Sequence, residues 1–437
     1  MPATRFHRDA PARRAAPPAR AAHRKVATIV VGGGQAGLAI SRCLTDRGHD
    51  HVVLERGRIG ERWRSERWDS LRLLTPNWMS RLPGYAYRGP DPDGFMSKAD
   101  VVDLLARYAR SFAAPVEEGT AVRTASPTAE GWRVETDRGT WSAHNLVVAT
   151  GACDTPWVPD AAAGLDRSIR QVTTTGYRSP AALPPGGVLV VGASATGAQL
   201  ADELRRAGRE VVLAAGNHNR LVRTYRGRDV MWWLDRTGVL DRRVEDLRDP
   251  SSGRGEPSLQ LVGRPGGSVD LGALRAAGIG VAGRLVAADG RTVRFDRQLR
   301  RRVAAADLRL RRLLERFDRW ADAHGLSGEL PPAEPVAPVV LPDDGPAELD
   351  LDAAGIRTVL WAVGFRRSYP WLPAAALDGC GEIRHRRGHG ELPGLYALGL
   401  QFMTRRRSSF LDGVGRDAEE IAVTICGRAT DPSSLAA

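Results

Sequence analysis

The fold is decided by the stretch Val26-Ala27-Thr28-Ile29-Val30-Val31-Gly32-Gly33-Gly34-Gln35-Ala36-Gly37. Its β-branched apolar run predicts a buried parallel strand, and apolar residues at helical spacing over 36–47 predict a helix directly afterwards. Between the two lies a G-x-G-x-x-G motif, in which Gly32 permits a tight turn, Gly34 lets a pyrophosphate approach the backbone, and Gly37 allows close helix–strand packing. The stretch therefore predicts a dinucleotide-binding βαβ unit.

The next predicted strand, His51 to Glu55, ends in an acid. Glu55 lies 18 positions after Gly37, where a carboxylate accepts a hydrogen bond from an adenosine ribose hydroxyl. The amides at the helix start, at Gln35 and Ala36, act together with the helix dipole to bind a diphosphate. A glycine turn in an unrelated α/β sheet is the alternative, and the strand, helix and acid around the motif argue against it.

A second unit of the same kind begins at Gly187. Residues 187–191 form an apolar β-branched run, residues 195–206 have helical periodicity, and residues 210–213 predict the next strand. The turn between them reads Gly192-Ala193-Ser194-Ala195-Thr196-Gly197, with a serine in place of the middle glycine. Two such units indicate two redox cofactors that exchange a hydride, and the first site is the usual place of FAD.

No acid follows the strand of the second unit. The chain continues Ala214-Ala215-Gly216-Asn217-His218-Asn219-Arg220. An arginine in this region is what a 2′-phosphate requires, which favours NADPH over NADH and makes Arg220, Arg223 or Arg226 candidates. The alternative is that these arginines are solvated loop charges.

The remaining segments predict an α/β protein with two Rossmann-like domains. Predicted elements are a helix over 98–112, strands between Val122 and Val148 that end in the turn Ala149-Thr150-Gly151, a helix over 299–324, a Pro-rich connector over 330–346, strands over 356–364 and 395–399, and a helix from about Phe410 to Cys426. We expect an FAD-binding domain over 26–155 and 340–437, into which an NADP-binding domain over 156–339 is inserted. Residues 1–25 are expected to be a disordered basic tail.

Composition excludes several classes of protein. The chain has 437 residues, 42% hydrophobic and 26% charged, and a net charge of +12. About half of that excess comes from arginines of the first 25 residues, so a nucleic-acid-binding face is not expected. No apolar run approaches the roughly 18 residues of a membrane span, which predicts a cytoplasmic protein. The four cysteines, at positions 43, 153, 380 and 426, are far apart, so neither a disulfide framework, a metal site nor the dithiol of a disulfide reductase is expected.

The motifs in their order resemble those of the flavin-containing monooxygenases, a class B flavoprotein family, and in particular an actinobacterial cluster labelled "putative flavoprotein involved in potassium transport". The resemblance extends from Val26 onward. It is carried by the first glycine motif with Glu55-Arg56, by Gly60-Glu61-Arg62-Trp63, Leu73-Leu74-Thr75-Pro76, Ala149-Thr150-Gly151, Tyr225-Arg226-Gly227-Arg228-Asp229, Trp361-Ala362-Val363-Gly364-Phe365, Gly394-Leu395-Tyr396-Ala397-Leu398-Gly399, and Ser408-Ser409-Phe410-Leu411-Asp412-Gly413.

The resemblance implies FAD and NADPH as cofactors and a set of site residues. The implied FAD-binding positions are Gly32, Gly34, Gln35, Ala36, Gly37, Glu55, Arg56, Trp63, Thr75, Val122, Ala149, Thr150, Gly151, Gly399, Ser409 and Phe410, and the implied NADP-binding positions are Gly192, Ser194, Ala195, Thr196, Gly197, Arg220 and Arg223. Asn77 is the catalytic candidate, near the reactive flavin carbon. A core position for Trp63 and a plain turn position for Asn77 are the alternatives.

The reaction implied by the resemblance is oxygenation of a small organic molecule by O2 through a C4a-(hydro)peroxyflavin, with nitrogen or sulfur as the favoured atom. The family's F-x-G-x-x-x-H stretch is missing from residues 168–175, so Baeyer–Villiger oxygenation is less favoured. An NADPH oxidase or reductase, or a redox-sensing regulatory protein, is the alternative. The run Arg405-Arg406-Arg407 predicts either a site for an acidic substrate or, more usually, a solvated run of charges.

Overall fold

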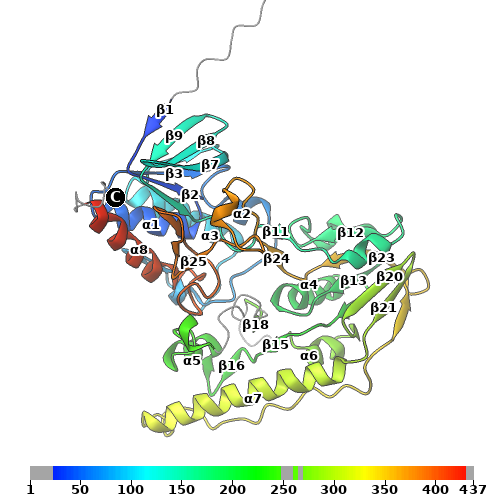
Figure 1. The fold of residues 1–437 in the computed structure, drawn as a ribbon. Coiled ribbons are helices and arrows are strands. Elements are labelled where there is room, and N and C mark those ends of the chain that lie inside the picture. The colour runs from blue at the N-terminus through cyan, green and yellow to red at the C-terminus, as the bar shows by residue number, and fades with distance from the viewer. Residues whose placement is uncertain (1–22, 248–258, 264–268, 430–437) are drawn as a thin grey trace, which may run out of the picture.

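The chain is organised around two sheets (Figure 1), a mixed one whose central strands are parallel and a second one that is parallel throughout. One glycine loop follows a central strand of each sheet, β2 (Thr28–Val31) in the first and β13 (Gly187–Val191) in the second. The computed structural model describes residues 23–247, 259–263 and 269–429. Within these ranges, no helix combines the length and the apolar character needed to cross a bilayer.

The first sheet has the strand order β25-β26-β27-β10-β2-β3-β6. Its strands are β2 (Thr28–Val31), β3 (His51–Glu55), β6 (Val116–Glu118), β10 (Asn145–Val148), β25 (His385–Arg386), β26 (His389–Gly390) and β27 (Leu395–Ala397). Helices α1 (Gln35–Thr45), α3 (Lys98–Ser111) and α8 (Val414–Ala429) complete this domain, and α1 packs against both α3 and α8. Strands β2 and β10 are buried throughout, as their continuous apolar sequence requires.

A smaller sheet, β1-β9-β8-β7, belongs to the same domain. Its strands are β1 (His23–Lys25), β7 (Val122–Thr128), β8 (Gly131–Thr136) and β9 (Gly139–Ala143). Strand β1 runs parallel to β9, and the guanidinium of Arg24 lies 4.8 Å from the ring centre of Trp141. The prediction that the tail extends to residue 25 is therefore wrong by three residues. The part of the predicted tail before His23 lies outside the described residues.

The second sheet has the order β12-β23-β13-β14-β19. Its strands are β12 (Arg170–Thr173), β13 (Gly187–Val191), β14 (Val211–Ala214), β19 (Gly280–Ala282) and β23 (Ile356–Trp361), next to the helices α4 (Ala195–Arg206) and α6 (Leu271–Ala276). A three-stranded sheet of β20 (Leu285–Asp289), β21 (Thr292–Phe295) and β22 (Glu348–Asp350) completes this domain, and the helices α5 (Val230–Arg236) and α7 (Leu299–Ala323) pack on one another along its edge (Figure 1).

Short elements connect these parts. They are α2 (Glu61–Ser65), η1 (Asn77–Met79), β4 (Arg81–Leu82), β5 (Tyr85–Ala86), β11 (Thr155–Pro156), η2 (Asp160–Gly164), η3 (Pro180–Ala182), β15 (Asn219–Arg220), β16 (Thr224–Tyr225), β17 (Arg228–Asp229), η4 (Val244–Asp246), β18 (Leu259–Gln260), β24 (Phe365–Arg366) and η6 (Ala374–Ala376). Strands β11 and β24 pair antiparallel. They lie where the chain leaves the first domain and where it returns.

The inserted arrangement of the two domains is confirmed, but the return boundary at residue 340 is wrong. Strand β23, expected in the first domain, lies between β12 and β13 in the second sheet. The chain returns to the first sheet only after β24, and β27 then pairs with β10. An apolar run suits a buried parallel strand in either sheet, so its sequence does not specify which neighbours it pairs with.

Candidate functional site

The first glycine loop leaves an open space above the start of α1. Gly32 has a φ of 113°, and a Cβ there would lie 2.6 Å from the carbonyl oxygen of Ala149. A Cβ on Gly37 would lie 1.8 Å from the oxygen of Gly32, whereas one on Gly34 would meet nothing within 4 Å. Gly32 and Gly37 are thus required for packing, and the space beside Gly34 fits the pyrophosphate of a dinucleotide.

Glu55 lies at the end of β3 beside this loop. Its Oε2 accepts a hydrogen bond from the Gly33 amide at 2.6 Å, and its Oε1 accepts one from the Gly57 amide at 2.8 Å. The backbone of Thr120 donates to the Glu55 carbonyl at 2.8 Å, which brings the start of β7, at Val122, close to the same edge. The carboxylate therefore braces the loop at the place where an adenosine ribose would bind.

Two segments near the end of the chain reach the start of α1. Gln35 donates from Nε2 to the carbonyl oxygen of Ser409 at 2.7 Å. Gly399 has a φ of 78°, and a Cβ there would lie 2.7 Å from the Cβ of Ala36. The structure thus brings together predicted site residues that are more than 350 positions apart in the sequence.

The helix expected from Phe410 begins four residues later, at Val414. A turn precedes it, in which the amide of Phe410 donates to the carbonyl of Arg407 and the amide of Val414 donates to the carbonyl of Phe410. Ser409 and Phe410 therefore lie in this turn rather than in the first turn of α8.

The remaining residues predicted to bind FAD differ in how far they are buried. Trp63 is half-buried in α2, with the guanidinium of Arg67 at 5.7 Å from its ring centre. Arg56 is exposed and pairs with Glu66 at 3.5 Å. Thr75 is half-buried just before η1, and Thr150 and Gly151 follow Ala149 in the turn that faces Gly32.

Asn77 is buried, with 6% of its surface exposed. Its Nδ2 donates to the carbonyl of Asp91 at 2.8 Å, while its Oδ1 is buried without a hydrogen-bond partner. A buried amide oxygen without a partner is costly, and a bound group that donates to it would remove that cost. This environment fits a role at a ligand site better than that of a plain turn residue.

The second glycine loop repeats the backbone contacts of the first. Gly192 has a φ of 109°, and a Cβ there would lie 2.4 Å from the carbonyl oxygen of Ala362. A Cβ on Gly197 would lie 1.7 Å from the oxygen of Gly192. Ser194 precedes α4, which begins with Ala195 and Thr196, and its side chain makes no capping hydrogen bond. The start of α4 therefore repeats the loop geometry found at the start of α1, and helix starts of this kind bind diphosphates.

The contacts of Arg220 and Arg223 do not favour the prediction that one of them binds a 2′-phosphate, which stays a prediction. Arg220 is 10% exposed in its side chain and pairs with Asp270 at 2.8 Å and Asp307 at 2.7 Å. Arg223 is 3% exposed and donates from Nε to Asp229 at 2.7 Å. Both guanidinium groups are committed to carboxylates inside the second domain, because the segment after β14 turns them inward. Arg226 likewise pairs with a carboxylate, at 3.1 Å.

The run Arg405-Arg406-Arg407 predicts either a site for an acidic substrate or a solvated run of charges. Both interpretations are wrong for Arg407. Its side chain is buried and pairs with Asp412 at 2.6 Å, with Asp241 at 3.1 Å and with Asp235. Asp412 also pairs with Arg81. Burial raises the pKa of Asp412, although the two guanidinium groups act in the opposite direction. The network joins the second domain to the turn before α8, and no sequence spacing indicates it.

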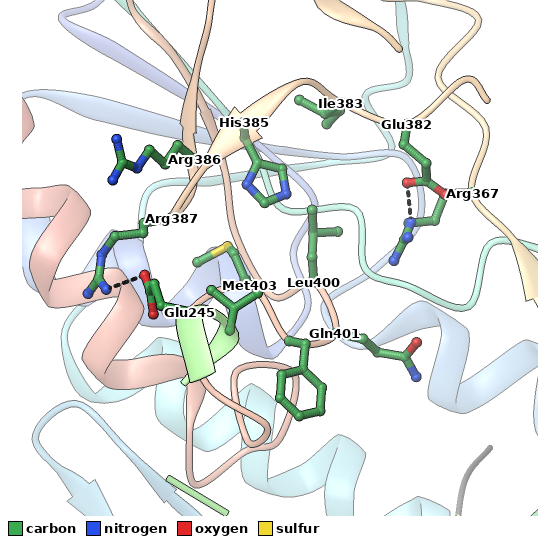
Figure 2. A pocket seen from close by; sticks show the side chains of 12 residues that line it. Glu245, Arg367, Glu382, Ile383, His385, Arg386, Arg387, Leu400, Gln401 and Met403 are labelled. Carbon is green, nitrogen blue, oxygen red and sulfur yellow. Dashed lines mark hydrogen bonds and ion pairs between the residues drawn. The ribbon is translucent and has the colours of Figure 1, made fainter. Parts of the chain in front are cut away.

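A pocket of about 220 Å³ opens beside the loop that follows β27 (Figure 2). Its polar walls are two ion pairs, Arg367 with Glu382 at 2.5 Å and Arg387 with Glu245 at 3.0 Å. Apolar side chains lie between these walls, namely Ile383, Leu400, Phe402 and Met403. Glu245 comes from the second domain, so the pocket lies between the domains. The sequence analysis did not predict it.

The four cysteines are all unpaired. Cys43 is buried in α1, and burial raises the pKa of its thiol to about 12. A thiol of this kind is a poor nucleophile at neutral pH. Cys43 is therefore unsuited to thiol–disulfide exchange.

Comparisons with known proteins agree with this geometry. The family described as "Pyridine nucleotide-disulphide oxidoreductase" matches residues 29–234. An uncharacterized CzcO-like oxidoreductase of Geobacillus kaustophilus is 30% identical over 90% of this chain and 96% of its own. A probable indole-3-pyruvate monooxygenase of Arabidopsis thaliana, YUCCA4, is 34% identical over 41% of this chain and 44% of its own.

The fold is also that of a solved enzyme. The structure of a flavin-containing monooxygenase from Stenotrophomonas maltophilia superposes with a TM-score of 0.65 at 20% identity, over 93% of this chain and 100% of that one. The names of these relatives do not carry the potassium-transport label of the resembling cluster.

Proposed function

This chain belongs to the flavin monooxygenase-like family that includes the CzcO-like oxidoreductases, and from that premise we propose that it uses NADPH and O2 to oxygenate a soft nitrogen or sulfur atom of a small organic molecule. It is an oxidoreductase of a family whose members use FAD and NADPH. The observation that carries the proposal is the pair of glycine loops with matching backbone geometry in one chain whose cysteines are unpaired.

The residues of the first loop have separate tasks in binding FAD. The amides at the start of α1 and the open space beside Gly34 hold the diphosphate, and Glu55 holds the ribose. Ser409 and Gly399 close the site from the end of the chain. Bound FAD supplies a hydride acceptor that, once reduced, reacts with O2.

The residues of the second loop hold the reductant. The amides after Ser194 bind the diphosphate of NADPH, and the buried Gln260 holds the loop by donating to the carbonyl of Ala193. Asn77 has an unpaired buried Oδ1, which accepts a hydrogen bond from bound cofactor or substrate. The interdomain pocket of Figure 2 offers apolar surface between fixed charges, which suits a small amphipathic substrate.

The alternatives remain an NADPH oxidase or reductase and a redox sensor. Baeyer–Villiger oxygenation is less favoured, because residues 168–175, which include β12, contain no histidine.

Rapid mixing tests the proposal. The purified protein is reduced with NADPH without oxygen and mixed with oxygenated buffer while the flavin spectrum is recorded, with and without added NADP and with panels of amines, thioethers and ketones. We expect a transient spectrum before that of oxidised flavin, a longer lifetime with NADP, and faster decay with an amine or a thioether. Incorporation of ¹⁸O from labelled O2 into that compound shows that the added oxygen comes from O2, and fragmentation of the labelled product in the mass spectrometer identifies the oxygenated atom. Stoichiometric hydrogen peroxide with every panel, and no labelled product, would show an oxidase instead.

A further inference from the structure

The second unit differs from the first at the residue that should contact the ribose. The amide of Gly32 donates to the carbonyl of Leu54 at 2.8 Å, and the amide of Gly192 donates to that of Ala214 at 2.9 Å. The position after Ala214 therefore corresponds to Glu55. Ala215 fills it and is completely buried, so this position has no group that can bind a ribose hydroxyl.

A neighbouring strand brings an arginine to the same edge. Strand β19 runs parallel to β14, with Ala282 paired to Ala214, so the carboxyl ends of both strands lie together. Arg284 follows β19 by two residues. A Cβ placed on Gly216 would lie 3.4 Å from the Nε of Arg284 and 3.7 Å from its Nη2. The guanidinium thus lies against Gly216, one residue beyond the position that corresponds to Glu55.

The charge of Arg284 is not neutralised locally. Its side chain is exposed, and no carboxylate in the described part of the chain forms an ion pair with it. The nearby Asp296 is already held by Arg302 through a hydrogen bond of 2.6 Å. That bond keeps the pKa of Asp296 below its usual range. Arg302 and Asp296 cancel one another, which leaves a net positive charge at Arg284.

The loop after β14 is fixed beside this charge. Arg309 of α7 donates to the carbonyl of His218 at 2.7 Å and to the side chain of Asn219 at 3.1 Å. His218 is buried, with its Nδ1 at 3.0 Å from the carbonyl of Gly216. Gly216 is therefore held in place, and its missing side chain leaves one side of the Arg284 guanidinium uncovered.

We propose that Arg284 binds the 2′-phosphate of NADPH and sets the preference for NADPH over NADH. This inference rests on the proposed function, because it assumes that the second loop receives a nicotinamide dinucleotide. A guanidinium binds a phosphate through paired, charge-assisted hydrogen bonds. NADH has a ribose hydroxyl in place of the phosphate and gains little from this cation.

The test compares the wild type with Arg284→Ala and with Arg294→Ala as a matched control. Arg294 is an exposed arginine of β21 in the same domain. Flavin reduction is followed with NADPH and with NADH, and binding of adenosine 2′,5′-bisphosphate and of adenosine 5′-monophosphate is measured by calorimetry. In Arg284→Ala we expect the KM for NADPH and the Kd for the bisphosphate to rise about 10- to 100-fold, with changes below about 2-fold for NADH and the monophosphate. Arg294→Ala should leave all four values unchanged.

The possible failures are distinguishable. Equal losses for NADPH and NADH in Arg284→Ala, or unchanged binding of the bisphosphate, would overturn the role of Arg284 while the wild type still used NADPH. A wild type whose flavin neither nucleotide reduces would overturn the proposed function and this inference with it. Partial recovery in Arg284→Lys, which keeps the charge but loses the planar fork, would support the phosphate role.

Discussion

The two glycine loops share their backbone geometry but differ in the chemistry that surrounds them. In both loops the first glycine packs against the carbonyl oxygen of a residue that follows a neighbouring strand, Ala149 in the first loop and Ala362 in the second. The last glycine of each loop packs against the carbonyl oxygen of the first glycine. In the first loop Glu55 is supplied by the adjacent strand of the same unit. In the second, the corresponding position is apolar, and the cation beside it, Arg284, comes from the segment that follows β19. The comparison shows that the two loops share their backbone packing, whereas the charged side chains beside them differ.

The two loops also differ in how their flanking charges are used. The carboxylate of Glu55 accepts hydrogen bonds from two backbone amides, so it stabilises the loop even without a ligand. In the second unit the arginines that follow β14 are taken up by carboxylates, and Arg220 alone binds two. The arginines that follow β14 in sequence are therefore held in ion pairs. Arg284, which is more distant in sequence, has no ion-pair partner in the described part of the chain.

The largest expected effect is that of Arg220→Ala on the second unit. The change leaves the buried carboxylate of Asp270 and the half-buried carboxylate of Asp307 without their cation, which should lower the free energy of unfolding by about 3–5 kcal/mol. Denaturant unfolding measures the loss, and Arg294→Ala should change stability by less than about 0.5 kcal/mol. If the variant is as stable as the wild type but selectively loses NADPH, Arg220 binds the phosphate after all.

Replacing the last glycine of each loop by alanine tests whether the two loops are packed equally closely against their helices. Gly37→Ala and Gly197→Ala would each place a Cβ less than 2 Å from a backbone oxygen, so each helix must shift, at a cost of about 3 kcal/mol. Thermal unfolding should detect similar losses in both variants. Only Gly37→Ala should also lose FAD, and equal FAD loss in both would show that the two sites are not separable.

A bulky residue at the middle position separates ligand binding from packing. Gly34→Leu should fold, because its Cβ enters open space, but it should bind FAD at least about 100-fold more weakly, since the side chain fills the place of the pyrophosphate. Ser194→Leu should stay yellow with full FAD and instead raise the KM for NADPH. Flavin absorbance per protein measures the first effect. A Gly34→Leu protein with full FAD would contradict the assignment of the first site.

The smallest expected effect is a decrease of the free energy of unfolding as the pH is lowered. Burial lowers the pKa of His51 in the first unit and of His218 in the second. Below the ordinary histidine value near 6.5, the unfolded chain takes up protons that the buried imidazoles do not. The free energy of unfolding should therefore fall as the pH decreases from 7, by at most about 1.4 kcal/mol per pH unit for each histidine.

Variants of the two histidines show how much each βαβ unit contributes to this change of the free energy of unfolding with pH. His51→Gln and His218→Gln should each flatten the fall in stability between pH 7 and 5, as measured by urea unfolding at each pH. A slope that neither variant changes would show that carboxylates, and not these imidazoles, cause the acid sensitivity.

Much of the fold could be predicted because its signals are local. Strand β3, strand β13 and helix α4 have the bounds that periodicity predicts. The position of β23 could not be predicted, since an apolar strand fits between any two buried strands. Strand β1 was also missed: three polar residues give no strand signal, and β1 forms because β9 offers a free edge and Glu117 pairs with Arg24 at 2.9 Å.

The sequence by itself determined the two glycine motifs, the βαβ units around them and the acid at Glu55, because each depends on residues within about 25 positions of one another. Only the tertiary structure decided which charged groups are free. Arg220, Arg223 and Arg407 lie inside ion pairs, and both partners of Arg220 and two of the three partners of Arg407 come from distant segments. Arg284, by contrast, reaches the second loop from the segment after β19 and has no ion-pair partner in the described part of the chain. The physical reason is that a charge becomes available or neutralised through its neighbours in space, and sequence distance does not specify those neighbours.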